Sequence, residues 1–311
     1  MNERSRIQLA SAVVMVRPAA FGFNPETATT NAFQKENTDL SHREIQLRAR
    51  REFDLMVERL RTSGVDVVVL EDSETPVTPD AVFPNNWISF HADGTVVLYP
   101  MYAPNRRLER RHDIASQLAA AGYKVTRILD LCHHELEGRY LEGTGSIVFD
   151  HIERCAYANI SPRTHPDVLK ELCTAIGYSP ITFRAVDAGG KDIYHTNVMM
   201  SIGDGFAVVC GESIPDPIER RLVLESLESA GREIVNISFA QLAHFAGNVL
   251  QVQSGEGTVI SMSTAACLAF SPSQRAVLEK YGHIVESPIP MIEGIEGGSA
   301  RCMLAGIHLS R

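Results

Sequence analysis

The sequence has no hydrophobic run that could cross a membrane. A transmembrane helix needs about 20 consecutive apolar residues, whereas the apolar run from Leu9 to Val16 near the N-terminus is short and contains Ser11. This run ends in Arg17 and Pro18, without the small-residue cleavage site of a signal peptide. We therefore predict that it forms a first strand, in a protein without membrane partners.

Cysteine pairs that could build a disulfide framework are missing as well. The six cysteines are scattered and none forms a CxxC pair. This distribution suits reduced thiols in a cytoplasmic enzyme. The cysteines are Cys132, Cys155, Cys173, Cys210, Cys267 and Cys302.

Positive charge is scarce. The 29 Lys and Arg residues face 38 Asp and Glu residues, which gives a formal net charge of -9. No basic stripe is available to release counterions from a nucleic acid. A phosphate-binding Gly loop and a dinucleotide fingerprint are also absent. We therefore expect a small polar or charged substrate, no nucleic-acid partner and no cofactor.

Metal-binding motifs are absent too. The run His133-His134-Glu135 is not accompanied by an HExxH or CxxC pattern. In an extended segment, adjacent histidines point in opposite directions. The sequence therefore predicts no metal site.

What the chain does contain is a short repeated pattern. Five stretches open with a polar, small or reactive residue and continue into an apolar, β-prone segment. They are Asn86-Trp-Ile-Ser-Phe, Gly145-Ser-Ile-Val-Phe, Asn197-Val-Met-Met-Ser, Asn248-Val-Leu-Gln-Val and Cys302-Met-Leu-Ala-Gly.

The first four stretches run through a turn into a second strand, then a helix and usually one more strand. We predict, for example, one helix from Arg106 to Ala121. The strand from Cys302 to Leu309 has no hairpin partner after it, while the N-terminal unit lacks a full hairpin. Joining these two ends gives five ββαβ-like units in a single α/β domain over residues 1–311.

Units of this kind that close into a ring bring equivalent positions together at the centre. A thiol, an imidazole and a carboxylate meeting there indicate an active site. The residues expected at this point are Asn86, Asn197, Asn248, Cys302, His195 and Glu142.

Each of these residues also has a structural interpretation. Cys302 could be an ordinary buried strand cysteine, but Gly297-Gly298 allows close backbone approach and Arg301 supplies a cation that favours a thiolate. His195 could be structural, yet an imidazole titrates near neutrality and can transfer protons. Glu142 could be a surface loop acid, although flanking glycines indicate a backbone that bends around a ligand.

The ordered motifs resemble the guanidine-modifying (amidinotransferase, pentein) superfamily across essentially the whole chain. The resemblance rests on Glu142-Gly-Thr-Gly145, on His195-Thr-Asn197 and on Gly297-Gly-Ser-Ala-Arg-Cys302. It implies a five-bladed α/β propeller. Thr78-Pro-Asp80 through Asn85-Asn86 is similar to the segment that holds the substrate-binding acids in dimethylarginine hydrolases.

The resemblance also implies roles for individual residues. Cys302 would be the nucleophile, His195 the general acid and base, and Glu142 the acid that orients His195 or the substrate. Arg106 and Arg163 would hold a substrate α-carboxylate, a task suited to the planar guanidinium. The expected substrate-binding residues are Asp80, Asn85, Asn86, Arg106, Arg163 and Asn197.

Two departures from the resemblance bear on the substrate. Arginine-processing members usually place acids where this chain has Asn86 and Asn197. A buried guanidinium cation is costly unless it is paired, whereas amides suit a neutral head that donates and accepts hydrogen bonds. The chain also resembles the citrulline-utilisation hydrolases. We therefore expect hydrolysis of citrulline to ornithine, carbon dioxide and ammonia.

Two alternatives stay open. Asp80 and Glu142 could suffice to pair a cation in an arginine deiminase or a dimethylarginine hydrolase. The same ring could also serve as a non-catalytic binding module. The sequence is compatible with a homo-oligomer but does not specify one.

Overall fold

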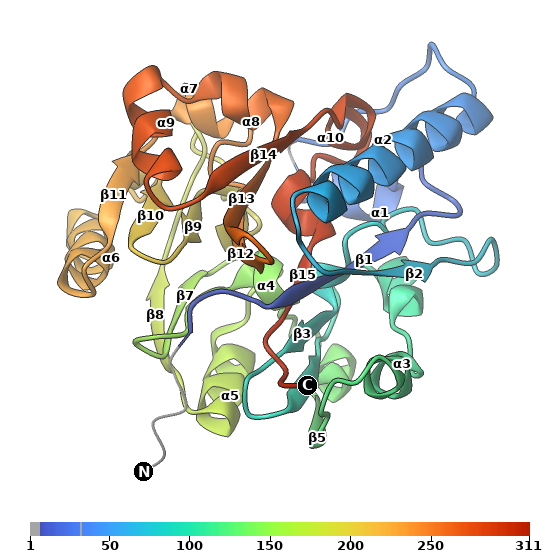
Figure 1. The fold of residues 1–311 in the computed structure, drawn as a ribbon, viewed down its shortest axis with the longest axis horizontal. Coiled ribbons are helices and arrows are strands. Elements are labelled where there is room, and N and C mark those ends of the chain that lie inside the picture. Colours follow the sequence, from blue (N-terminus) through green and yellow to red (C-terminus); the bar gives the residue numbers. More distant parts are fainter. Residues whose placement is uncertain (1–6, 32) are drawn as a thin grey trace.

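The computed structural model describes residues 7–31 and 33–311, which form a mixed α/β fold. Short strands occupy the interior, and most helices lie at the rim (Figure 1). None of the helices in these described ranges is long and apolar enough to cross a membrane.

One three-strand arrangement occurs five times in the described residues. Its first two strands pair antiparallel, and its second and third strands pair parallel. The five triplets are β3 (Ile88–Phe90), β4 (Thr95–Leu98) and β5 (Arg127–Asp130); β6 (Val148–Asp150), β7 (Cys155–Asn159) and β8 (Ser179–Phe183); β9 (Met200–Ile202), β10 (Phe206–Val209) and β11 (Glu233–Asn236); β12 (Leu250–Ser254), β13 (Gly257–Ser263) and β14 (His283–Ser287); and β15 (Ala305–Ile307), β1 (Ala12–Arg17) and β2 (Val67–Glu71).

The fifth triplet joins the two ends of the chain. β15 runs antiparallel to β1, with Ala12 opposite Ile307 and Val14 opposite Ala305. β1 in turn pairs in parallel with β2. The prediction that the last strand completes the N-terminal unit is confirmed.

Two of the triplets merge into a larger sheet. A parallel pairing of Ile307 in β15 with Phe90 in β3 creates a six-stranded sheet in the order β2-β1-β15-β3-β4-β5. The other three triplets remain separate three-stranded sheets, and within residues 7–31 and 33–311 no sheet closes on itself. The mixed α/β fold is thus established, while the five-bladed propeller stays a prediction.

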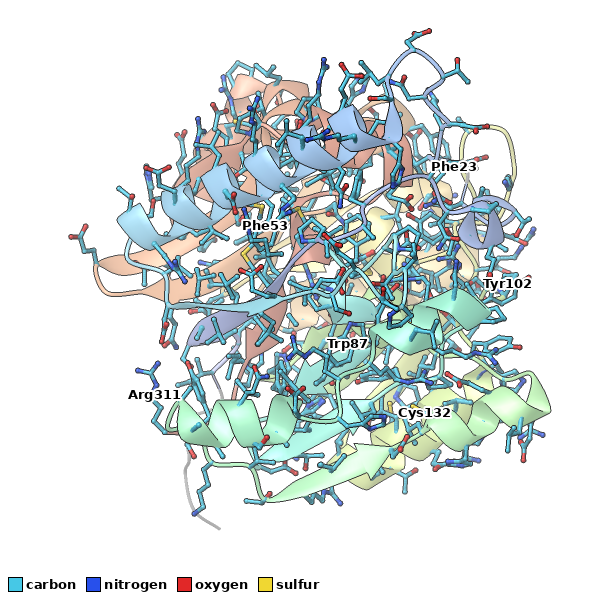
Figure 2. The ribbon with its side chains drawn as sticks, turned by 90° about the vertical axis from the view of Figure 1, so that its right-hand side faces the viewer. Phe23, Phe53, Trp87, Tyr102, Cys132 and Arg311 are labelled. Carbon is cyan, nitrogen blue, oxygen red and sulfur yellow. The ribbon has the colours of Figure 1, made fainter. Side chains whose placement is uncertain are left out.

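The long helix α2 (His42–Thr62) packs against the six-stranded sheet at β1 and β2. Ser41 and Glu44 form the predicted capping box at its start. Its buried face includes Phe53 and Leu60, which pack into the same cluster as Val13 and Met15 of β1. Figure 2 shows Phe53 on the inner side of this helix. Helices that follow the second strands of the other units are α3 (Ile114–Ala120), α5 (Pro166–Ile176), α6 (Pro217–Ser229), α8 (Thr264–Ala269) and α9 (Pro272–Glu279).

The predicted single helix from Arg106 to Ala121 is wrong. A 3-10 helix, η2 (Pro104–Glu109), is followed by Arg110 in an extended conformation, and α3 begins only at Ile114. In a 3-10 helix the residues i and i+3 lie above one another. This alignment pairs Arg106 with Glu109 and favours the tighter helix.

The strand starts are also corrected by the structure. Asn86, Asn197 and Cys302 lie in single helical turns that precede β3, β9 and β15. The fourth such turn contains Gly145. These turns are η1 (Pro84–Asn86), α4 (Gly143–Ser146), η4 (Thr196–Val198) and η6 (Ala300–Met303).

Candidate active site

The helical turns approach one another closely at two glycines. A Cβ atom on Gly145 would lie 2.4 Å from Asn86 Nδ2 and 2.8 Å from His195 Nδ1. Gly143 has a φ of +48°, and a Cβ there would lie 2.3 Å from the carbonyl oxygen of Asn85. Only glycine allows this approach, so the motif Glu142-Gly-Thr-Gly145 packs η1 against α4 and places Glu142 beside His195.

Cys302 is buried in η6, and its sulfur is surrounded by amide groups. Asn248 Nδ2 lies 3.3 Å and Asn197 Nδ2 lies 3.5 Å from Cys302 Sγ, close enough to donate to it. Asn248 Oδ1 accepts the backbone N–H of Arg301 at 3.0 Å, which orients the amide. Hydrogen-bond donors of this kind stabilise a thiolate.

His195 and Glu142 form a buried hydrogen-bonded pair, with 2.8 Å between Nε2 and Oε2. Burial lowers the pKa of His195 to about 4, although the Glu142 carboxylate acts in the opposite direction. The imidazole is therefore neutral at physiological pH and available as a base. Burial opposes ionisation of Glu142, but Arg163 and the hydrogen bond to His195 outweigh it and hold the pKa of the carboxyl well below its usual range.

Arg163 is enclosed by internal partners. Its Nη1 lies 3.4 Å from Glu142 Oε2. Its Nη2 donates to Thr30 Oγ1 at 2.6 Å and to the carbonyl oxygen of Thr27 at 3.0 Å. The guanidinium also lies over the ring of Tyr194, 4.9 Å from the centroid.

Arg106 is likewise paired within the protein. It forms a two-pronged contact with Glu109, with both N–O distances at 2.9 Å. Its Nε lies 3.3 Å from Asp80 Oδ2, and its Nη1 donates to Asn86 Oδ1 at 2.8 Å. The structure thus gives both arginines internal carboxylate partners, and their role in holding a substrate carboxylate stays a prediction.

These side chains surround one small pocket of about 20 Å³. Both Cys302 and His195 line it. Glu142 contacts His195, and Asn197 and Asn248 contact Cys302. The residues that line the pocket are Thr27, Asn31, Asp80, Phe83, Asn86, Arg106, Arg163, Tyr194, His195, Glu296, Gly298 and Cys302.

Asn85 does not belong to this pocket. Its side chain is buried elsewhere, and neither amide atom has a partner among the described residues. Its backbone oxygen accepts from Thr144 Oγ1 at 3.3 Å. The role of Asn85 in substrate binding stays a prediction, because its side chain is not among the residues that line this pocket.

Sequence reasoning missed Glu296, the last residue of α10 (Pro290–Glu296). It is buried in the pocket wall, and Gln34 Nε2 donates to its Oε2. Burial and the neighbouring Asp80 raise the pKa of Glu296 well above its usual range, which favours the protonated acid. Its position directly before Gly297-Gly298 was the available signal, because this double glycine leads to Cys302.

The segment from Asn24 to Asn31, here called the N-terminal loop, was missed as well. Asn24 donates to Asp80 Oδ2 at 2.8 Å and caps α1 (Pro25–Ala28). Thr27 and Asn31 then line the pocket. Nothing in their spacing in the sequence marked them as functional.

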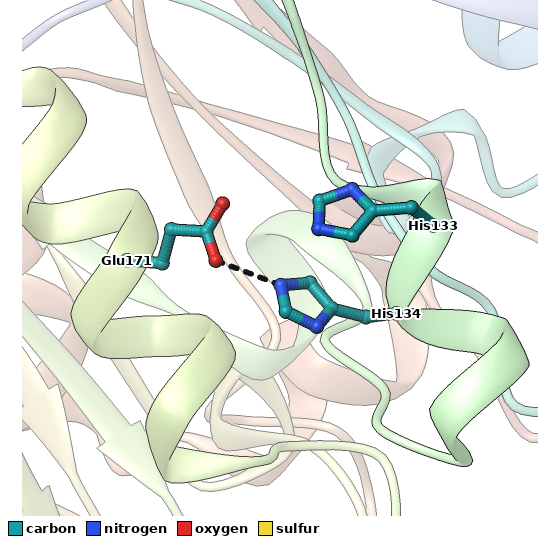
Figure 3. Close-up of side chains that lie close together, drawn as sticks. All are labelled: His133, His134 and Glu171. Atoms are coloured by element: carbon teal, nitrogen blue, oxygen red, sulfur yellow. Dashed lines mark hydrogen bonds and ion pairs between the residues drawn. The ribbon is translucent and has the colours of Figure 1, made fainter.

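The prediction that His133 and His134 point apart is wrong. Both lie in the 3-10 helix η3 (Cys132–Glu137), and their ring centroids are only 4.2 Å apart. Figure 3 shows them beside Glu171 of α5, which contacts His134 Nε2 at 2.8 Å. One potential ligand atom from each residue lies within 4.8 Å of the others. This cluster is separate from the pocket of Cys302, with which it shares no residue.

Comparison with known proteins identifies the chain. Residues 17–309 match the family described as N,N dimethylarginine dimethylhydrolase, eukaryotic. The chain belongs to this family. It is therefore a hydrolase of carbon–nitrogen bonds other than peptide bonds that uses a cysteine nucleophile, and the alternative of a non-catalytic binding module is set aside.

Solved structures agree with the fold. The N-terminal domain of ArgZ, an arginine dihydrolase of cyanobacteria, is 18% identical, with a TM-score of 0.71, and the match covers 94% of this chain and 96% of that one. Against the longer ArgZ chain, the match covers 40% of ArgZ. A dimethylarginine hydrolase of Pseudomonas aeruginosa complexed with citrulline is 16% identical, with a TM-score of 0.64, and 95% and 98% of the two chains are covered. No curated protein matches the chain.

Proposed function

We propose that this chain is a cysteine hydrolase that cleaves citrulline to ornithine, carbon dioxide and ammonia, with Cys302 as the nucleophile. The observation that carries the proposal is the convergence of Cys302 and His195 on one buried pocket. The Cys302 sulfur there faces two amide donors, and His195 is paired with Glu142. A nucleophile and a base that is oriented by a third group are the minimal parts of covalent hydrolysis.

The proposed reaction has two stages. His195 takes the proton of the Cys302 thiol as the sulfur attacks the ureido carbon and passes it to the departing nitrogen, so that ammonia leaves and the carbon stays bound to sulfur and to the ornithine nitrogen. His195 then takes a proton from water, whose oxygen attacks the same carbon and releases the sulfur. The resulting carbamate breaks down to ornithine and carbon dioxide, so one water is consumed in each cycle.

The charges around the pocket favour a neutral head group. Glu142 faces Arg163, and Asp80 faces Arg106, which it shares with Glu109, so each of these acids already lies beside a cation. The raised pKa of Glu296 favours its protonated form. A protonated acid can donate to the ureido oxygen, while the Asp80 carboxylate accepts from a ureido N–H.

A cationic guanidinium is the second candidate head group. Asp80 Oδ1 and Glu296 Oε1 are buried, and no partner for either is found in the described part of the chain. If Glu296 released its proton, the two carboxylates would bind an arginine or methylarginine head as an ion pair. The two candidates thus differ in the protonation state that Glu296 must adopt.

Access to the pocket requires movement of the N-terminal loop. A volume of about 20 Å³ accommodates roughly one water molecule, so an amino acid can enter only when the walls separate. Thr27 and Asn31 of this loop form part of the lining. We propose that the loop opens for substrate and that the five strand triplets surround the site as one catalytic domain.

Product analysis tests the proposal. The protein is incubated in parallel with citrulline, arginine and N,N-dimethylarginine, and ornithine, citrulline, ammonia and dimethylamine are quantified. We expect equal amounts of ornithine and ammonia from citrulline. Conversion of arginine or dimethylarginine that stops at citrulline would establish the second candidate. A lack of turnover with all three substrates would overturn both assignments.

A further inference from the structure

The structure contains a second cavity, with a volume of about 60 Å³. The two cavities share no lining residue, but Arg301 lines the second cavity and its neighbour Cys302 lines the first. Residues from the first strand of each triplet, β3, β6, β9, β12 and β15, contribute to its wall. Because a water needs about 10–15 Å³, the space accommodates a few waters or a small ion.

Among residues 7–31 and 33–311, no acidic residue lines this cavity. Its titratable side chains are one arginine and three histidines, namely Arg301, His91, His151 and His308. The chain as a whole has 38 acidic residues and a net charge of -9, so a wall without acids runs against the overall composition. The cavity therefore presents positive potential and hydrogen-bond donors.

Arg301 is the exception among the buried arginines of the described residues. Arg106, Arg163 and Arg232 each contact a carboxylate within 4 Å. Arg301 is only 9% exposed, yet within the described ranges it forms no ion pair. Among the described residues, its guanidinium donates only to two carbonyl oxygens, that of Leu304 at 3.1 Å and that of Thr144 at 3.5 Å.

A buried cation without a counter-charge is costly. Burial lowers the pKa of Arg301 to about 10, but the guanidinium stays protonated at neutral pH. The neighbouring Cys302 sulfur acts on Arg301 electrostatically, but its contacts within hydrogen-bonding distance are to the amides of Asn197 and Asn248. The described residues thus give the guanidinium no hydrogen-bonded negative partner, and an anion in the cavity would supply one.

Two neutral side chains leave donor positions free in the same wall. His91 Nδ1 and Ser201 Oγ are buried, and the described residues supply no partner for either atom. His91 Nε2 is engaged with Ser89 Oγ at 2.8 Å, and burial lowers the pKa of His91 to about 4. When Nε2 accepts from the hydroxyl, Nδ1 carries the proton and can donate to a ligand.

We propose that this cavity binds a small monovalent anion, the size of a halide or bicarbonate, with Arg301 as its cationic partner and His91 and Ser201 as donors. Entry is possible beside His308, which lines both this cavity and a neighbouring open groove that contains Arg311. The site is distinct from the catalytic pocket and does not depend on which substrate that pocket takes.

Bromide provides a direct probe. Crystals soaked in sodium bromide should give an anomalous peak in the cavity, in contact with Arg301. In solution, bromide should raise the melting temperature relative to gluconate at equal ionic strength. The Arg301→Met variant should weaken this effect at least tenfold. The exposed Arg221 of α6 gives a matched control, and Arg221→Met should respond to bromide like the unmodified protein.

Two further variants keep the test independent of the folding of Arg301→Met. Ser201→Ala and His91→Gln should each weaken bromide binding about threefold, in line with one lost hydrogen bond. Equal stabilisation of all variants would overturn the proposal, and so would a peak that appears only at crystal concentrations without an effect of these substitutions in solution. A parallel titration with bicarbonate separates an oxyanion site, which binds it more tightly than bromide, from a simple halide site.

Discussion

The cavity lined by Cys302 and the cavity lined by Arg301 differ in how they accommodate buried charge. In the catalytic pocket, the guanidinium groups of Arg106 and Arg163 are matched by acids of the same chain. In the neighbouring cavity, Arg301 has no acidic partner among the described residues. The buried arginines of the catalytic pocket thus have acidic partners without a ligand, whereas the buried arginine of the neighbouring cavity has none among the described residues.

This difference determines what each cavity is expected to bind. In the catalytic pocket the arginines already have acidic partners, so a ligand is selected mainly by the hydrogen bonds that it forms. In the neighbouring cavity, Arg301 has no acidic partner among the described residues, so this cavity instead selects a ligand with negative charge. The comparison therefore depends on the protonation of Glu296 and on the amides near Cys302, and the following experiments test these features.

The largest effect is expected from removal of the sulfur. Cys302→Ala should lower turnover of the preferred substrate by at least about a thousandfold, because covalent catalysis then has no nucleophile. The melting temperature should change little. Cys155, a half-buried cysteine outside the pocket, supplies the control, and Cys155→Ala should retain activity. Ornithine release at the normal rate by Cys302→Ala would reject this residue as the nucleophile.

The next largest effect should come from the acid behind His195. Glu142→Gln should reduce kcat by about a hundredfold, since a neutral amide no longer supports a charged imidazole during proton transfer. The matched control is Glu171, which contacts His134 at the same 2.8 Å but outside the pocket. Steady-state kinetics of Glu171→Gln should match those of the unmodified enzyme. A similar loss in both variants would indicate a purely structural role for Glu142.

Replacement of amides by acids tests the selection for a neutral head. Asn86→Asp and Asn197→Asp should shift the ratio of kcat/KM for citrulline and arginine about tenfold toward arginine, because a new carboxylate near the head group attracts a cation. Asn236→Asp, on the strand β11 outside the pocket, serves as the control. If arginine binds no better to either pocket variant, the neutral-head argument fails.

The strand triplets could be predicted from the sequence because their signals are local. Turns such as Ala92-Asp93-Gly94 and helix starts such as Ser41 and Pro166 are encoded by adjacent residues, and they were placed correctly. The pairing of β15 with β1 followed from counting strands in a repeated pattern. The same repeat predicts from the sequence alone that Cys302, His195 and Asn197 lie close together.

Long-range electrostatics could not be predicted in this way. The pairing of Arg163 with Glu142 and the approach of Glu296 to Asp80 depend on how distant loops fold over the pocket. A sequence pattern does not show which neighbour compensates a charge. For the same reason the sequence predicts an ordinary α-helix around Arg106, where the structure has a 3-10 helix.

The smallest effect, and the most discriminating, concerns the proton on Glu296. Its pKa is raised by burial and by Asp80, so the free enzyme keeps this proton to a higher pH than an ordinary carboxyl group and loses it as the pH rises through the raised pKa. If citrulline binds to the protonated acid, kcat/KM should fall above this pH. If a guanidinium binds to the ionised acid, kcat/KM should instead rise over the same range.

The Glu296→Gln variant isolates this contribution from Glu109, whose pKa burial raises to about 7. Glutamine keeps a donor at this position but cannot ionise. With citrulline, the variant should lose no more than about fivefold in kcat/KM at neutral pH, roughly the value of one imperfect hydrogen bond, and the decline assigned to Glu296 at high pH should disappear. A pH profile for citrulline that is unchanged by the substitution would show that Glu296 does not contact the head group, and the selection between neutral and cationic substrates would then rest on Asp80 and the amides alone.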